Sequence, residues 1–368
     1  MTTNAQTQIE TAVAEQLLHD LVATPSLSHS EGDAVALLVS WMGRSGYDQA
    51  FVDEVGNAVG IIGTGDGSRD IVLLGHIDTF PGKPPVHVAG RTLYGRGSVD
   101  AKGPLCTFAV AAANLRGQLP AGVRLVVIGA VEEEAATSAG AHHVVGQYAP
   151  QICLIGEPSR WDRMTLGYKG RLLLRWRWEG ELAHSAGEAQ TAGERAFAYW
   201  QQVQDYVARV NGEERSLFGR LDASIREINT GTSQAGTHQW GEMTVGFRLP
   251  PTLSPEQVTA ALVSTDEATV EPFGREDTFV AGRDNLLTRA LRGAIRAEGG
   301  SPRFVYKTGT ADMNVVGPRW KCPIVAYGPG DSALDHTPNE HIDLDEYGQA
   351  VRVLTSALGR ITRELVRL

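Results

Sequence analysis

Two nearly continuous apolar runs are the features that most constrain how this chain of 368 residues can fold. They span Arg124 to Val131 and Ile152 to Ile155. Runs of this kind are typical of strands that are buried on both faces, as in a parallel sheet. Helical patterns, among them Asp100 to Leu115 and Ala139 to Gln147, alternate with them. The alternation predicts an α/β layer structure with a mostly parallel central sheet.

The pattern changes near Gly167, because Arg171 to Glu179 alternates between apolar and polar residues with the period of a half-buried strand. The order β-α-β-β-α-β that follows predicts a small α+β unit of the ferredoxin-like kind. The alternation of helices and strands returns after about Thr278. We therefore expect a catalytic domain of residues 1–168 and 278–368, with residues 169–277 inserted into it.

Composition narrows the class of protein. The formal net charge of −10 argues against a broad nucleic-acid binder or a binder of anionic membranes. No apolar run approaches the ~18 residues of a membrane span, and the polar start predicts no signal peptide. Three widely spaced cysteines fit free thiols in a reducing compartment, so we expect a cytoplasmic protein.

The glycine-rich run Gly63 to Gly67 could be taken for a phosphate-binding loop. It lacks the Gly-Lys-Ser/Thr ending of such loops and opens no helix. We expect instead a hairpin turn between the strands Ala58 to Ile62 and Ile71 to Leu74.

Acidic and histidine side chains follow several of the expected strands or lie in nearby loops. They are His76 and Asp78, Asp100, Glu132 to Glu134, Glu157, and His336. Singly, each has an ordinary explanation, such as a satisfied polar pair, a helix N-cap or a solvated loop. Together, nitrogen and oxygen donors without cysteine suit zinc, cobalt or manganese. Two ions would need one shared carboxylate, and one adjacent acid would have to stay uncoordinated as a base.

An ordered set of motifs resembles the acetylornithine deacetylase / succinyl-diaminopimelate desuccinylase family of dinuclear zinc hydrolases. The motifs are Gly75-His76-Ile77-Asp78-Thr79, Gly95-Arg96-Gly97-Ser98-Val99-Asp100-Ala101-Lys102-Gly103, Glu132-Glu133-Glu134, Gly156-Glu157-Pro158-Ser159, Ala183-His184-Ser185 and His336-Thr337-Pro338-Asn339-Glu340. The resemblance implies an α/β catalytic domain with an inserted dimerisation domain, and hence a homodimer.

The resemblance also implies a role for each matching residue. The metal ligands would be His76, Asp100, Glu134, Glu157 and His336, with Asp100 bridging two ions, zinc or alternatively cobalt. Asp78 would orient His76. Glu133 would be the general base, and His184 would reach into the partner subunit's site. Arg248 would hold a substrate carboxylate or be an ordinary surface arginine, and Asp312 could contact the ammonium group of a released lysine or cap a turn.

Within the family, Thr308 to Asn314 and Gly328 to Ser332 look most like hydrolases that release lysine or ornithine from an amino-group carrier protein. Since the carriers of this family are acidic, a basic docking patch would be expected, with Lys169, Arg171, Arg175 and Arg177 as candidates. Three alternatives stay open: a deacylase of free acetyl-lysine, acetylornithine or succinyl-diaminopimelate, a dipeptidase or carboxypeptidase, and a metal-free binding protein.

Overall fold

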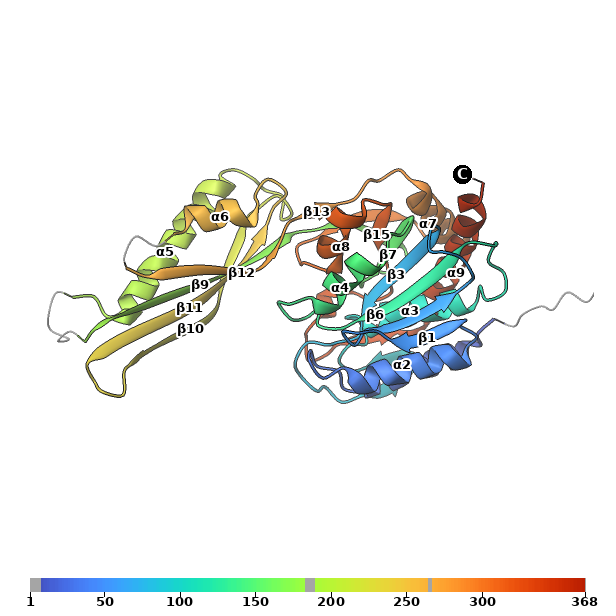
Figure 1. Cartoon of the computed structure of the whole chain (residues 1–368), viewed down its shortest axis with the longest axis horizontal. Helices are drawn as coiled ribbons and strands as arrows, with labels where there is room; N and C mark the ends of the chain where they lie inside the picture. Colours follow the sequence, from blue (N-terminus) through green and yellow to red (C-terminus); the bar gives the residue numbers. More distant parts are fainter. Residues whose placement is uncertain (1–7, 183–188, 264–266, 368) are drawn as a thin grey trace, which may run out of the picture. The chain divides into compact units, whose positions relative to one another are not determined.

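The computed structural model of the chain describes residues 8–182, 189–263 and 267–367. The chain forms two compact units, each with its own hydrophobic core (Figure 1). The larger unit comprises Met1–Gly167, Ala281–Tyr306 and Ala311–Leu368, and the smaller unit comprises Tyr168–Val280 and Lys307–Thr310.

The largest sheet described is mixed and has nine strands. Its strands are β1 (Gln49–Val52), β2 (Ala58–Ile62), β3 (Asp70–His76), β6 (Arg124–Ala130), β7 (Ile152–Gly156), β8 (Arg163–Tyr168), β13 (Phe279–Val280), β14 (Arg303–Lys307) and β15 (Ile324–Ala326). All of them except β13 belong wholly or mainly to the larger unit. The spatial order is β1-β2-β6-β3-β7-β15-β8-β13, and β14 pairs with β8. The four central strands β6, β3, β7 and β15 are parallel, while β1, β2 and β8 pair antiparallel. The sequence prediction of an α/β fold is thus confirmed, with antiparallel strands toward both edges.

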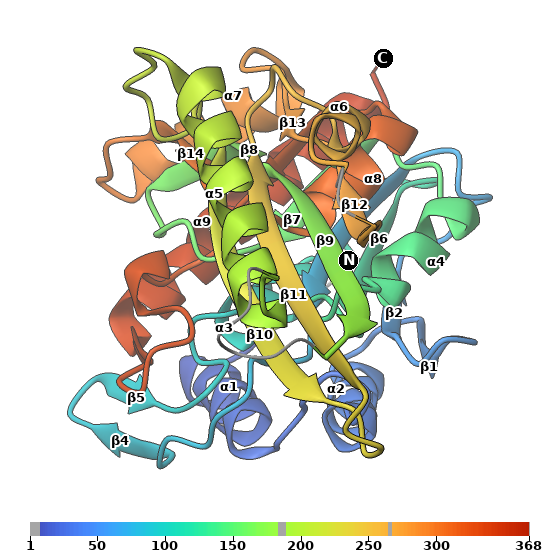
Figure 2. The same ribbon diagram turned by 90° about the vertical axis from the view of Figure 1, so that its left-hand side faces the viewer.

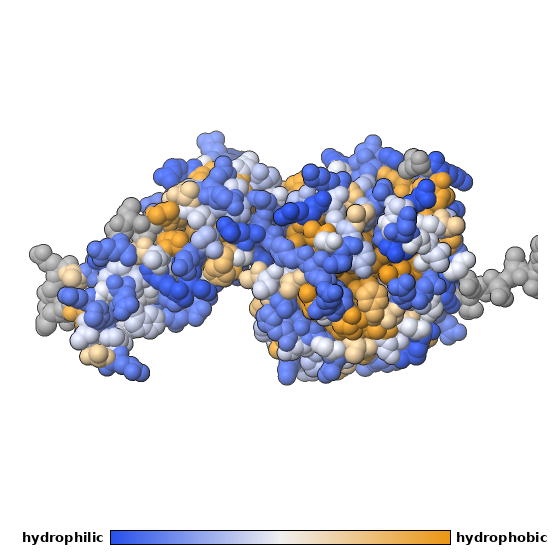
Figure 3. Space-filling model, in the orientation of Figure 1, coloured by the Kyte–Doolittle hydropathy of each residue, from blue (hydrophilic) through white to orange (hydrophobic). Residues whose placement is uncertain are grey.

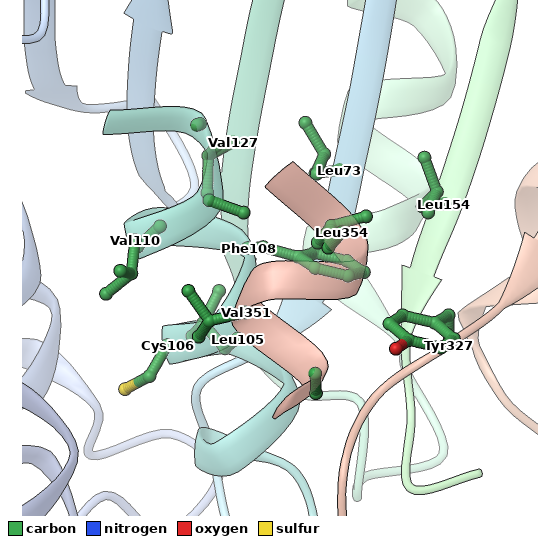
Figure 4. Close-up of a cluster of buried hydrophobic side chains, with 14 of the residues drawn as sticks. Leu73, Leu105, Cys106, Phe108, Val110, Val127, Leu154, Tyr327, Val351 and Leu354 are labelled. Atoms are coloured by element: carbon green, nitrogen blue, oxygen red, sulfur yellow. The ribbon is translucent and has the colours of Figure 1, made fainter. Parts of the chain in front are cut away.

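Helices cover both faces of this sheet. They are α1 (Thr11–Ala23), α2 (Gly32–Arg44), α3 (Lys102–Ala113), α4 (Ala139–Gln147), α7 (Leu286–Ala297), α8 (Asp312–Trp320) and α9 (Leu344–Leu365). Figure 4 shows α3 and α9 packed over Leu73 of β3, Val127 of β6 and Leu154 of β7. Every residue of α3 is buried. Because Val72 and Val126, which point to the other face, are also fully buried, the central strands carry apolar residues almost without interruption.

The loop of residues 63–67 corrects one sequence prediction. It does not close a hairpin, because β2 and β3 are not neighbours but lie on either side of β6. The loop passes the beginning of β6, where Gly122 N donates to Thr64 O at 3.1 Å. A local turn pattern carries no information about β6, which comes about 60 residues later in the chain and lies between β2 and β3.

A second, small sheet has the order β16-β5-β4 and joins segments that are far apart in the sequence. It consists of β4 (His87–Ala89), β5 (Thr92–Tyr94) and β16 (His341–Asp343). The sequence patterns missed these strands, because three residues are too few to show a period. The pairing of β16 with β5 brings the segment after His336 beside the loop that contains Asp100.

The smaller unit is an antiparallel four-stranded sheet with two helices on one face (Figures 1 and 2). Its elements are β9 (Gly170–Glu181), α5 (Ala192–Asn211), β10 (Asp222–Thr232), β11 (His238–Leu249), α6 (Pro255–Ala261) and β12 (Thr269–Glu276). The strand order β10-β11-β9-β12 is the ferredoxin-like one. Leu172, Leu174 and Trp176, at alternate positions of β9, are buried in its core.

Hydrophilic residues cover much of the face shown in Figure 3 and are interrupted by smaller apolar areas. Within the described residues, no helix is both long and apolar enough to cross a membrane. The three cysteines form no disulfide, and Cys106 and Cys153 are buried.

Candidate dinuclear metal centre

Two of the expected ligands meet at the carboxyl ends of neighbouring parallel strands. His76 is the last residue of β3, and Glu157 follows β7 directly. Because Gly75 pairs with Gly156 in the register of these strands, the two side chains start from adjacent positions. His76 Nε2 lies 3.9 Å from Glu157 Oε1, and both side chains are buried. Ligand sites of α/β folds are found at this edge of the sheet.

Asp100 links this pair to a second one. It lies in the loop between β5 and α3, and Ala101, not Asp100, occupies the N-cap position of α3. Asp100 Oδ1 lies 3.2 Å from His76 Nε2, and Oδ2 lies 3.0 Å from His336 Nε2. His336 Nε2 is also 3.0 Å from Glu134 Oε1. The two oxygens of one carboxylate therefore face two different histidines.

All five ligands expected from the sequence come together as two groups of three donors that share Asp100. One group is His76, Asp100 and Glu157, and the other is Asp100, Glu134 and His336. Within each group the donor atoms lie within 4.8 Å of one another. The donors are imidazole nitrogens and carboxylate oxygens, a set that zinc and related divalent ions accept. A shared carboxylate is the usual way to hold two ions ~3.5–4 Å apart.

The electrostatics of the cluster also favour cations. Burial lowers the pKa of His336, but hydrogen bonds to Asp100 and Glu134 outweigh it and raise this pKa to about 10. Burial raises the pKa of Glu157 well above 4.5, and repulsion from Asp100 and Glu133 raises it further. Without a metal, protons on His336 and Glu157 thus reduce the electrostatic repulsion in the cluster. Divalent ions would replace them, since ligands must be deprotonated to bind.

Asp78 connects the ends of β3 and β6. Its Oδ1 lies 3.3 Å from His76 Nδ1 and accepts the backbone N–H of Glu133 at 3.1 Å. Its Oδ2 accepts the backbone N–H of Glu134 at 3.0 Å and the Ser28 hydroxyl at 2.7 Å. The carboxylate is fully buried. Asp78 therefore orients a histidine on one side and fixes the acidic turn after β6 on the other.

Glu133 lies in the same cluster but belongs to neither group of three donors. Burial raises its pKa well above 4.5; His76 opposes this rise, while Asp312, Glu134 and Asp100 add to it. Asp312, the first residue of α8, is itself buried. A carboxylate with a raised pKa beside a metal centre is suited to accept and later return a proton.

The other expected site residues are less informative. Arg248 lies on β11 of the smaller unit, where its Nη1 donates to Thr310 Oγ1 at 2.7 Å. His184 lies outside the described residues. Their roles toward a substrate stay predictions.

The prediction that Lys169 belongs to a basic docking patch is wrong. This side chain is fully buried, and its Nζ donates to Leu217 O at 3.1 Å and to Asp222 Oδ2 at 2.5 Å. Arg175 and Arg177 lie 3.3 and 3.2 Å from the Glu242 carboxylate. Their charges are therefore partly neutralised within β9 and β11.

Sequence reasoning missed several residues around the centre. Glu31 is buried, and its Oε1 accepts the backbone N–H groups of His29 and Glu132. The Phe80 ring stacks on that of His336 with centroids 4.1 Å apart. Neither stands in a pattern that marks it. Glu340 is buried as well, and it stood in the quoted motif after His336, so its spacing was a usable signal.

A sheet whose carboxyl edge carries two histidine-and-carboxylate groups joined by one aspartate defines a metal-dependent hydrolase of the dinuclear type. More particularly, the chain belongs to peptidase family M20/M25/M40, whose family model matches residues 72–360.

Known proteins agree with this assignment. The chain is 46% identical to the LysW-lysine hydrolase of Deinococcus radiodurans over 95% of this chain and 97% of that protein. It is 30% identical to the LysW-lysine/LysW-ornithine hydrolase of Sulfurisphaera tokodaii over 79% of this chain and 81% of that protein. The M20 family metallo-carboxypeptidase Sso-CP2 from Sulfolobus solfataricus shares the fold, with a TM-score of 0.78 at 16% identity, covering 95% of this chain and 99% of that one. So does the YXEP protein of Bacillus subtilis, a dinuclear metal binding peptidase, with a TM-score of 0.63 at 15% identity, covering 97% and 98% of the two chains.

Proposed function

We propose that this protein hydrolyses the amide bond that joins lysine, or ornithine, to an amino-group carrier protein in lysine or arginine biosynthesis. The observation that carries the proposal is the 46% identity to the LysW-lysine hydrolase, which extends over nearly the full length of both chains. The two donor groups that share Asp100 supply the chemistry such a reaction needs. The buried free thiols of Cys106 and Cys153 fit a cytoplasmic location.

The residues have distinct tasks in the proposed reaction. Two divalent ions, zinc or alternatively cobalt, would be held by the two groups that share Asp100 and would lower the pKa of a water while polarising the amide carbonyl. Glu133 takes a proton from the attacking water and returns it to the departing amine. Asp78 keeps His76 and the turn of Glu133 oriented throughout.

A panel of substrates tests the proposal. The zinc- or cobalt-loaded protein is assayed for release of free amino acid from carrier-linked lysine and carrier-linked ornithine. Acetyl-lysine, acetylornithine, succinyl-diaminopimelate and a dipeptide are assayed in parallel, with Glu133→Gln as the background. We expect kcat/KM to be much the highest for a carrier conjugate. Equal or better turnover of a free substrate would identify the protein as a deacylase or peptidase instead.

We further propose a homodimer formed through the smaller unit, in which His184 stabilises the oxyanion in the partner's site, as the family resemblance implies. Subunits carrying His184→Ala and subunits carrying Glu133→Gln, each inactive alone, are mixed and allowed to exchange. Cross-subunit action predicts one working site in each heterodimer and therefore recovered activity. Exchange without recovery would mean that His184 acts in its own subunit.

A further inference from the structure

Glu340 supports the backbone of the shared ligand. Its side chain is fully buried, and Oε1 accepts the backbone N–H groups of Val99 at 3.0 Å and Asp100 at 3.1 Å. The pairing of β16 with β5 brings it there, and Gly95 N donates to Glu340 O at 3.1 Å. A buried carboxylate is costly unless it is paired and hydrogen-bonded. This one is bonded to the backbone at the residue whose side chain would bridge the two ions.

Arg96 joins Glu340 to the second group of ligands. Its Nη1 lies 2.7 Å from Glu340 Oε2, and its Nη2 donates to the backbone carbonyl of His336 at 3.3 Å. The Arg96 side chain is only 10% exposed. The guanidinium group of Arg96 therefore connects the Glu340 carboxylate to the backbone of His336. The rigid, forked arrangement of its N–H donors suits such a double contact.

His336 needs such support because of its backbone conformation. Its φ of 62° lies in the left-handed region, which residues other than glycine seldom adopt. The residue lies in a loop after the short helix Ser332–Leu334, and its ring is 40% exposed. The bond from Arg96 to the His336 carbonyl and the stacking of Phe80 on the ring limit its movement.

We propose that Glu340 and Arg96 are positioning residues that set the metal affinity of the group Asp100, Glu134 and His336. This inference rests on the dinuclear centre of the proposed function. The pair acts on two of the three ligands of this group but on only one ligand of the other group, Asp100. Its loss should therefore weaken the binding of one ion more than that of the other.

The test measures how many zinc ions the full chain binds, and with what affinities, by calorimetric titration of metal-free protein. Glu340→Gln keeps an oxygen acceptor for the two N–H groups but loses the charge pair with Arg96. Arg96→Lys keeps the charge but cannot span both Glu340 and the His336 carbonyl. We expect each variant to bind one ion about 10- to 100-fold more weakly, with a smaller change for the other ion and a folded circular-dichroism spectrum.

Asp70→Asn is the matched control. Asp70 forms a buried, bidentate pair with Arg124, with both N···O distances 2.7 Å, at the opposite end of β3 and β6. It should lower the melting temperature but leave both zinc affinities unchanged. Wild-type affinities in Glu340→Gln and Arg96→Lys, or an equal loss in Asp70→Asn, would overturn the positioning role. If the wild-type chain itself failed to bind two ions, the dinuclear centre of the proposed function would be wrong instead.

Discussion

Glu133 and Glu134 are adjacent in the sequence, yet their surroundings differ in a way that fits the different tasks proposed for them. Glu134 Oε1 lies 3.0 Å from His336 Nε2 and belongs to a ligand group, whereas Glu133 belongs to neither group. Asp78 accepts both backbone N–H groups and so fixes the turn that separates the two side chains. The proposed roles of ligand and base for two like residues thus depend on one buried carboxylate that orients their backbone.

Glu133→Gln should abolish most turnover while leaving metal binding intact. The amide cannot accept a proton, and loss of a general base typically lowers kcat by about 10²- to 10⁴-fold. The measurements are single-turnover amide hydrolysis and zinc content after dialysis. Glu132→Gln, in the same turn, is the control, since Glu132 contacts His29 and Thr137 and lies outside both ligand groups. Near wild-type rates in Glu133→Gln would disprove its role as base.

Asp78→Asn should weaken both metal binding and turnover. The amide keeps only one acceptor oxygen, so the backbone N–H of Glu133 or that of Glu134 loses its acceptor and faces an NH₂ group. Changes of this kind typically cost 10- to 100-fold in metal affinity or activity. Ser28→Ala removes only one of the donors and should have a clearly smaller effect. Zinc affinity and kcat are measured for both Asp78→Asn and Ser28→Ala. Equal effects of the two changes would count against the role given to Asp78.

The sequence marks the candidate ligands better than it marks the residues that hold them in place. All five expected ligands stand in motifs at strand ends or in loops, and the structure brings them together. The supporting residues Ser28 and Glu31 come from a loop about 50 and 100 residues away from the groups they bind. No local pattern marks them, because their importance comes only from the tertiary contact.

At the scale of elements, the close contact of β3 and β7 places His76 beside Glu157. Gly75 and Gly156 face each other in the register, and a Cβ on Gly156 would lie 2.9 Å from the Gly75 Cα. Gly156→Ala should therefore push the strands apart, destabilise the fold by about 1–3 kcal/mol and weaken the binding of the ion between His76 and Glu157.

Gly146→Ala in α4 is the control for Gly156→Ala. A Cβ at this helical position would meet nothing within 4 Å. The change should raise stability slightly, by about 0.4–1 kcal/mol, and leave zinc binding unaltered. Chemical denaturation and zinc titration measure both effects. A Gly156→Ala protein with wild-type stability and zinc affinity would show that β7 can shift without disturbing the ligands.

The elements that the sequence predicted best are those whose burial is nearly complete or strictly periodic. The apolar runs of β6 and β7 and the alternation of β9 matched the structure to within two residues at each end. The missed elements, such as β4, β5 and β16, are three residues long. The hairpin expected between β2 and β3 was wrong for a different reason, because pairing across the sheet depends on β6, far along the chain.

At the scale of the whole molecule, the two units have separate hydrophobic cores and differ in whether they contribute expected metal ligands. All five expected metal ligands belong to the larger unit, whereas the smaller unit has its own core around Trp176 and Phe247. The capping box of Thr191 and Glu194 at the start of α5 also lies within the smaller unit. Each unit therefore has the interactions that a separately stable body requires, and bound metal should act on their stabilities unequally.

Removing the metal should lower the stability of the larger unit selectively. The fold of this unit brings the donors of both groups together, and an ion present at 100 times its Kd stabilises the folded state by about 2.7 kcal/mol. Hydrogen exchange with and without a chelator should show faster exchange in β3, β6 and β7, and little change in β9 to β12. Added zinc should restore protection in the wild type but only partly in His336→Ala, which keeps a single complete ligand group. Equal loss of protection in both units would contradict this selectivity, because it would mean that the metal stabilises them as one cooperative body.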